Sequence, residues 1–240
     1  SYDSENKTLT LNNYNGGRVT VYSKNTTAED EITIHLKGEN TVTYTGSDIY
    51  AFGSGIPLTI TADENASLTI NGNYQNDQYI SIGLSSDKSL TIEGGTINVN
   101  LRTDFDSDTN LTSAGISAIE GLIIRGNAKV SVNIDTDYNI VSAVRVGKSG
   151  RTEYTPLHLG PNASLKINVN ARNKLNAENV YISSYTTYGT NTDFKIEGTV
   201  EEPSPIHKII IDDKVCLNDS NIEECVNAKE YSWDSENSIL

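Results

Sequence analysis

A short motif recurs along this chain: an apolar residue, any residue, a second apolar residue, then a polar residue and often a glycine. Its copies are Leu9-Thr10-Leu11-Asn12, Ile34-His35-Leu36-Lys37-Gly38, Leu68-Thr69-Ile70-Asn71-Gly72, Leu90-Thr91-Ile92-Glu93-Gly94, Leu122-Ile123-Ile124-Arg125-Gly126, Leu165-Lys166-Ile167-Asn168 and Phe194-Lys195-Ile196-Glu197-Gly198. Alternation over a few residues is the pattern of short strands that bury one face. The chain is therefore expected to consist of many short strands.

The composition agrees with this expectation. Ile, Val and Leu supply nearly all the apolar bulk, and the chain is rich in Asn, Thr, Ser, Gly and Tyr. β-branched and aromatic residues suit pleated strands, while Asn, Gly and Asp suit the turns between them. The sequence predicts an all-β fold.

Longer repeats surround the motif. The lead-in Asn65-Ala66-Ser67 returns as Asn162-Ala163-Ser164, with a looser copy at Asn127-Ala128-Lys129. A second kind of strand begins at positions spaced 25 to 39 residues apart. These openings are Ile49-Tyr50-Ala51-Phe52, Ile80-Ser81-Ile82-Gly83, Ile116-Ser117-Ala118-Ile119, Val141-Ser142-Ala143-Val144 and Val180-Tyr181-Ile182-Ser183. Each unit then holds about three strands, the length of one coil of a β-solenoid.

Stacking explains why such a repeat is stable. One coil of three strands cannot bury its apolar face, but coils piled along an axis form a continuous core. The predicted inward residues are Leu68, Ile70, Leu90, Ile92, Leu122, Ile124, Leu165 and Ile167, while Thr69, Thr91 and Lys166 between them face solvent. The alternative is an antiparallel sandwich, which would use Asn-Gly hairpin turns, and Asn15-Gly16 and Asn71-Gly72 are the main candidates. We favour the solenoid.

The C-terminal part has a different character. Glu201-Glu202-Pro203-Ser204-Pro205 is typical of a boundary, so we predict a β-helix over 1–200 and a cap, linker or start of a following module over 201–240. The last nine residues, Ser232 to Leu240, match the first nine at six positions. This echo indicates one module of a tandem array, whose neighbouring modules would be partners of this chain.

Charge and cysteine content narrow the functional classes. With 32 acidic and 18 basic residues the net charge is −14, which disfavours nucleic acid as a partner. No apolar run approaches the roughly 20 residues that span a membrane, so no membrane insertion is expected. Cys216 and Cys225 are interpreted as a short-loop disulfide in an oxidising compartment, with free thiols as the alternative.

Three features of the sequence together resemble tandem repeat modules of Gram-positive bacterial cell-surface proteins. They are the border sequence Tyr2-Asp3-Ser4-Glu5-Asn6-Lys7-Thr8-Leu9, the Leu-Thr-Ile-x-Gly units, and Ser89-Leu90-Thr91-Ile92-Glu93-Gly94-Gly95. The resemblance covers most of the chain. It implies a right-handed parallel β-helix, similar in shape to pectate lyases and carbohydrate-binding β-helix domains, and an extracellular location at the bacterial surface. In such proteins a segment like Ile209 to Asn227 precedes the border. The resemblance supplies no catalytic residues.

Two constellations are candidate binding sites. Asp104, Asp106 and Asp108 alternate on a polar loop and are candidate ligands for calcium, the only cofactor that we consider. A simple solvated loop is the alternative. The EF-hand pattern is rejected, because Thr109 stands where that motif needs glycine and Gly115 where it needs glutamate. Tyr181, Tyr185 and Tyr188, with Tyr74 and Tyr79, are candidates for a glycan-binding platform, although tyrosines are also common on strand surfaces.

Catalysis is expected to be absent. Asn191-Thr192-Asp193 and Asp212-Asp213 superficially resemble polygalacturonase motifs, but Phe194 replaces a glycine and the later basic motif is missing. No defensible lyase base accompanies the acidic residues. We therefore expect a non-enzymatic structural or adhesive module that contacts a glycan or another surface ligand. The alternatives are a carbohydrate-binding domain, assisted or not by calcium, and, less favoured, a polysaccharide lyase or glycoside hydrolase.

Overall fold

The structure is a computed structural model that describes residues 1–22, 30–75, 80–103, 112–136, 140–147, 155–171, 178–184, 192–196, 199–201, 208–211 and 214–217. In these ranges every regular element is a β-strand, and no helix occurs. The chain divides into two compact units, Ser1–Glu202 and Pro203–Leu240. They are described separately below.

Three sheets make up the first unit. Sheet A contains, in spatial order, β1 (Tyr2–Asp3), β2 (Thr8–Asn12), β5 (Ile32–Lys37), β8 (Leu58–Ala62), β11 (Ser89–Glu93), β14 (Gly121–Arg125), β17 (Thr155–Leu159) and β20 (Thr192–Ile196). Sheet B contains β3 (Asn15–Gly16), β6 (Glu39–Gly46), β9 (Ser67–Tyr74), β12 (Thr96–Thr103), β15 (Lys129–Thr136), β18 (Ser164–Ala171) and β21 (Thr199–Glu201). Sheet C contains β4 (Val19–Val21), β7 (Tyr50–Ser54), β10 (Ile80–Ser86), β13 (Thr112–Ala118), β16 (Ile140–Val146) and β19 (Glu178–Ser184).

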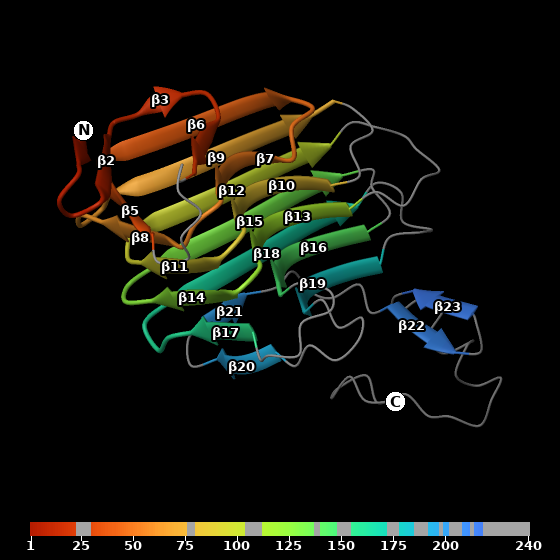
Figure 1. The fold of residues 1–240 in the computed structure, drawn as a ribbon. Coiled ribbons are helices and arrows are strands. Elements are labelled where there is room, and N and C mark those ends of the chain that lie inside the picture. The colour runs from red at the N-terminus through yellow and green to blue at the C-terminus, as the bar shows by residue number, and fades with distance from the viewer. Residues whose placement is uncertain are drawn as a thin grey trace. The chain divides into compact units, whose positions relative to one another are not determined.

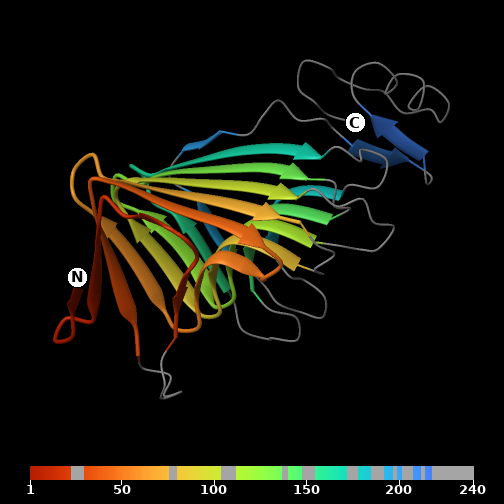
Figure 2. The same ribbon diagram turned by 90° about the horizontal axis from the view of Figure 1, so that it is seen from above.

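The chain visits the three sheets in turn, so that β5, β6 and β7 form one coil and β8, β9 and β10 form the next (Figures 1 and 2). Among the described residues of this unit, every strand pair is parallel except β1 with β2. The predicted parallel β-helix is confirmed, and the antiparallel sandwich is excluded. Asn15-Gly16 forms β3 and Asn71-Gly72 lies inside β9, so neither dipeptide makes a hairpin turn.

The core is the stack of inward side chains. All eight predicted inward residues are at most 2% exposed, while Thr69 and Thr91 are half-buried and Lys166 is exposed. In-register pairing places like residues above one another, as in the column Ile34, Ile60, Ile92, Ile124. Because each buried aliphatic side chain stabilises the fold by about 1.5–3 kcal/mol, the columns provide the main driving force for stacking.

Copies of the repeated motif, and the strand openings, do not occupy equivalent positions in successive coils. Copies of the motif belong to two different faces, since Leu68 and Leu165 lie on sheet B whereas Leu90 and Leu122 lie on sheet A. On sheet C, Ile116 pairs with Leu84, and the residue opposite Ile80 is Thr112. The strands of sheet C are buried at consecutive residues and not at every second one, as in β10 from Ser81 to Ser86. Local alternation therefore cannot fix this register.

Two glycines mark a close approach between sheets C and B. A Cβ on Gly83 would lie 2.2 Å from Cγ1 of Val99, and one on Gly115 would lie 2.1 Å from Cγ1 of Val132. Both distances are far below van der Waals contact. Glycine at these positions thus sets how closely the two sheets pack.

The β1–β2 hairpin covers the N-terminal edge of sheet A. Its turn is held by Asp3, whose Oδ1 accepts hydrogen bonds from the backbone N–H groups of Glu5 and Asn6 at 3.0 and 3.2 Å, while Asn6 Nδ2 donates to Asp3 Oδ2 at 2.8 Å. These three residues recur in the echo as Asp234, Glu236 and Asn237. The repeated sequence therefore includes the residues that build an edge-blocking turn in the first copy.

The second unit contains one described element pair. β22 (Lys208–Ile211) pairs antiparallel with β23 (Lys214–Leu217), and Ile209 lies opposite Cys216.

Candidate functional site

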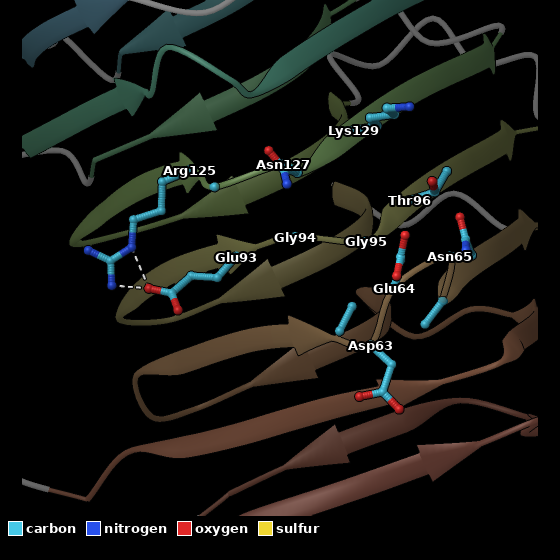
Figure 3. A pocket seen from close by; sticks show the side chains of 13 residues that line it. Asp63, Glu64, Asn65, Glu93, Gly94, Gly95, Thr96, Arg125, Asn127 and Lys129 are labelled. Carbon is cyan, nitrogen blue, oxygen red and sulfur yellow. Dashed lines mark hydrogen bonds and ion pairs between the residues drawn. The ribbon is translucent and has the colours of Figure 1, made fainter.

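The corners that join sheet A to sheet B differ in length, and this difference creates a hollow. The corner is Asp63–Ala66 after β8, Gly94–Gly95 after β11 and Gly126–Ala128 after β14. The two-residue corner is thus recessed between a four-residue and a three-residue corner. The resulting hollow of about 700 Å³ spans three consecutive coils (Figure 3).

Both residues of the short corner require glycine. Gly94 and Gly95 have φ angles of +83° and +74°, a region that side chains rarely adopt. A Cβ on Gly95 would lie 2.6 Å from Cβ of Ala62, whereas one on Gly94 would meet nothing within 4 Å. Gly95 is therefore packed against the preceding coil, and Gly94 faces the open space.

An ion pair stands on one side of the hollow. Glu93 and Arg125 lie opposite each other on the neighbouring strands β11 and β14, and the Arg125 guanidinium donates to Glu93 Oε1 (Figure 3). The Arg125 side chain is 59% exposed and that of Glu93 33%. Since the pair is solvated, it orients the two side chains more than it stabilises the fold.

A histidine outside the lining contacts the lining residue Asp63. His35 on β5 lies with Nδ1 2.9 Å from Thr61 Oγ1 and with Nε2 3.0 Å from Asp63 Oδ1. The tautomer that carries its proton on Nε2 satisfies both contacts, because Thr61 can donate to Nδ1. Lys37 Nζ approaches Asp63 Oδ2 at 4.0 Å. Asp63 is thereby positioned at the rim by two groups from the preceding coil.

The rest of the lining is mixed. Ala62, Ala66 and Gly126 contribute apolar and backbone surface, and the polar residues are Glu64, Asn65, Thr96, Asn127 and Lys129. Carboxylate and amide oxygens accept hydrogen bonds and amide and ammonium groups donate them, so the hollow offers both kinds of partner to a hydroxyl-rich molecule. Among the described residues, no group of three or more His, Cys, Asp or Glu side chains is arranged to hold a metal ion.

Most sequence-predicted site residues lie outside the described residues. This applies to the calcium candidates Asp104, Asp106 and Asp108, to Tyr79, Tyr185 and Tyr188, and to Cys225. Tyr181 lies in β19 and Cys216 in β23, but their side chains are also outside the described part.

The structure corrects the prediction for Tyr74. The sequence suggests it as part of a glycan-binding platform, but its side chain is fully buried and its hydroxyl donates to the backbone oxygen of Ile82. Burial raises the pKa of this phenol far above its usual value of 10. It packs against Tyr44 with ring centroids 5.6 Å apart. Tyr74 therefore belongs to the core, where the inward alternation of β9 places it.

The sequence alone does not mark the hollow. Gly94-Gly95 belongs to a repeated motif, but the hollow depends on the corners before and after it. The usable signal is the unequal number of residues between the paired strands, which becomes visible only when the strand register is known.

No protein-family model, curated protein or solved structure matches this chain. In the described part of the chain, no helix is long and apolar enough to cross a membrane.

Proposed function

We propose that this chain is a non-enzymatic structural or adhesive module of an extracellular bacterial surface protein. The observation that carries the proposal is the uninterrupted in-register stack of coils from β2 to β20, in which each inner strand is hydrogen-bonded to two parallel neighbours. Such a stack resists bending and presents side chains at fixed spacings, as a spacer or contact surface requires. The surface location rests on the resemblance of the border and Leu-Thr-Ile-x-Gly motifs.

Adhesion under flow tests this role. Beads coated with the purified chain should be retained on glycan-coated or protein-coated surfaces, and beads coated with heat-unfolded chain should not. Equal retention of folded and unfolded chain would contradict a role for the stacked surface. Activity on polygalacturonate that disappears in Asp193→Ala would show instead that the chain is an enzyme.

Carbohydrate binding is a second candidate, and the hollow beside Gly94 favours it. Carboxylates and amides, such as those of Asp63, Asn65 and Asn127, are typical partners of sugar hydroxyl groups. We expect binding on a glycan array, measured with and without calcium because of the acidic loop at Asp104, Asp106 and Asp108.

A matched pair of variants locates this binding. Asn127→Ala removes an amide from the hollow, while Thr91→Ala changes a half-buried outward residue of β11 that does not line it. The candidate site predicts weaker glycan binding for Asn127→Ala alone. Equal weakening in both variants, or none in either, would exclude the hollow.

A further inference from the structure

A ladder of asparagine side chains runs along the outer face of sheet B. Asn100 Nδ2 donates to Asn71 Oδ1 at 2.9 Å, Asn133 Nδ2 to Asn100 Oδ1 at 2.9 Å, and Asn168 Nδ2 to Asn133 Oδ1 at 2.7 Å. The four residues occupy one register position on β9, β12, β15 and β18. All four are half-buried, so the ladder is accessible from outside.

The ladder does not exhaust the hydrogen-bonding capacity of its amides. A primary amide has two N–H donors and an oxygen with two lone pairs, and each bond of the ladder uses one of each. Asn100 thus keeps one donor and one acceptor position. Asn133 keeps an acceptor position, while its second donor lies 3.4 Å from Ser131 Oγ, at the limit of a hydrogen bond. Successive coils are about 4.8 Å apart, so these positions recur at a regular interval.

The neighbouring columns are also polar. One side carries Thr69, Asn98, Ser131 and Lys166, and the other carries Asn73, Arg102, Asp135 and Asn170. Asn170 Nδ2 donates to Asp135 Oδ1 at 3.2 Å, which orders this column as well. These three columns contain no aromatic or aliphatic side chain, and their charges nearly balance.

This chemistry selects the kind of ligand. A packed protein partner needs apolar side chains at the centre of its interface, and these columns have none. An anionic polymer is disfavoured by the net charge of −14. A linear polymer of hydroxyl groups can both donate to and accept from each rung.

We propose that a linear neutral polysaccharide lies along the Asn71–Asn100–Asn133–Asn168 ladder, parallel to the axis of the β-helix. This inference rests on the carbohydrate-binding candidate and adds to it a surface separate from the hollow. The ladder holds its amides in place before binding, so little side-chain entropy is lost when the polymer binds.

Pull-down on cellulose and chitin, and affinity electrophoresis in a soluble β-glucan, test the inference, with polygalacturonate as the anionic comparison. The double variant Asn100→Leu/Asn133→Leu should bind at least about tenfold more weakly, given the loss of hydrogen bonds at two rungs. Thr91→Leu makes a similar change on the outer face of sheet A and should bind like the unmodified chain. Circular dichroism and thermal melting identify variants that fail to fold, and Asn100→Ala/Asn133→Ala then replaces the leucine pair.

The outcomes separate the two claims. Binding to a neutral polysaccharide that is lost in the ladder variant and kept in Thr91→Leu supports the inference. If binding is lost in Asn127→Ala but kept in the ladder variant, the hollow binds the sugar and the ladder inference is wrong. If the unmodified chain binds no neutral polysaccharide, the ladder inference fails, and the glycan array decides separately whether the carbohydrate-binding candidate survives.

Discussion

The side-chain oxygen of Asn40 accepts a hydrogen bond from the backbone N–H of Tyr14 at 2.9 Å, which ties the second coil to the first. The Asn40 amide nitrogen donates to the backbone oxygens of Lys37, Gly38 and Ser67 at 3.1–3.3 Å. Asn40 is only 1% exposed, and on β6 it lies opposite Leu68 of β9, at the start of an otherwise aliphatic column. One buried amide therefore joins three coils near the N-terminal end.

Replacing Asn40 by alanine is expected to lower the free energy of unfolding by roughly 2–4 kcal/mol, because several buried backbone groups lose their partner. Urea denaturation followed by far-ultraviolet circular dichroism measures the change. Asn98→Ala, at a half-buried outward position of sheet B, is the control and should change stability by about 0.5 kcal/mol or less. Similar effects of the two substitutions would contradict the role assigned to Asn40.

The aliphatic columns predict a sharp contrast within one strand. Ile92→Ala in β11 removes a side chain that is fully buried between Ile60 and Ile124, and should cost about 2–5 kcal/mol. Thr91→Ala changes its half-buried outward neighbour and should cost about 0.5 kcal/mol or less. Chemical denaturation of both variants tests the inward assignment of β11. A larger loss of unfolding free energy in Thr91→Ala than in Ile92→Ala would refute this assignment.

The two glycines of the corner Gly94–Gly95 allow the cost of backbone strain to be measured separately from the cost of a steric clash. Gly94→Ala places a side chain at positive φ in open space and should cost about 1–2 kcal/mol. Gly95→Ala adds a clash with Ala62 to a similar φ and should cost about 1–3 kcal/mol more. Thermal or urea denaturation compares them. Equal losses would mean that the corner relaxes around the new methyl group.

The burial of Tyr74 predicts that the free energy of unfolding depends on pH in the alkaline range. Burial raises the pKa of its hydroxyl above the value of about 10 that it has in an unfolded chain, so folding binds the phenolic proton more tightly. The associated stability is fully present below pH 10 and is lost as pH rises above it. Tyr74→Phe should lose about 1 kcal/mol at pH 7, through the bond to Ile82, but should be less sensitive to pH above 10.

Urea denaturation between pH 8 and pH 11 measures this difference. Tyr22→Phe is the matched control, because Tyr22 is 72% exposed and should leave the slope of stability against pH unchanged. Identical slopes in Tyr74→Phe and the unmodified chain would show that another group governs alkaline unfolding.

The sequence by itself determined the class of fold and its inward residues. Alternation of period two, as in Leu90-Thr91-Ile92, is a local property, so it assigned every predicted core position correctly and indicated stacked coils. The shortage of hairpin dipeptides also favoured the solenoid over the sandwich, and the structure agrees, because Asn71-Gly72 lies inside β9.

Only the tertiary structure decided which strands share a sheet and which residues lie opposite each other. Leu68 and Leu90 carry the same motif but belong to different sheets, and Ile116 lies opposite Leu84. These facts depend on how each coil closes, which no short window of sequence records. The hollow beside Gly94 and the ladder through Asn100 have the same origin. Each is built from residues about thirty positions apart, which become neighbours only when the coils stack in register.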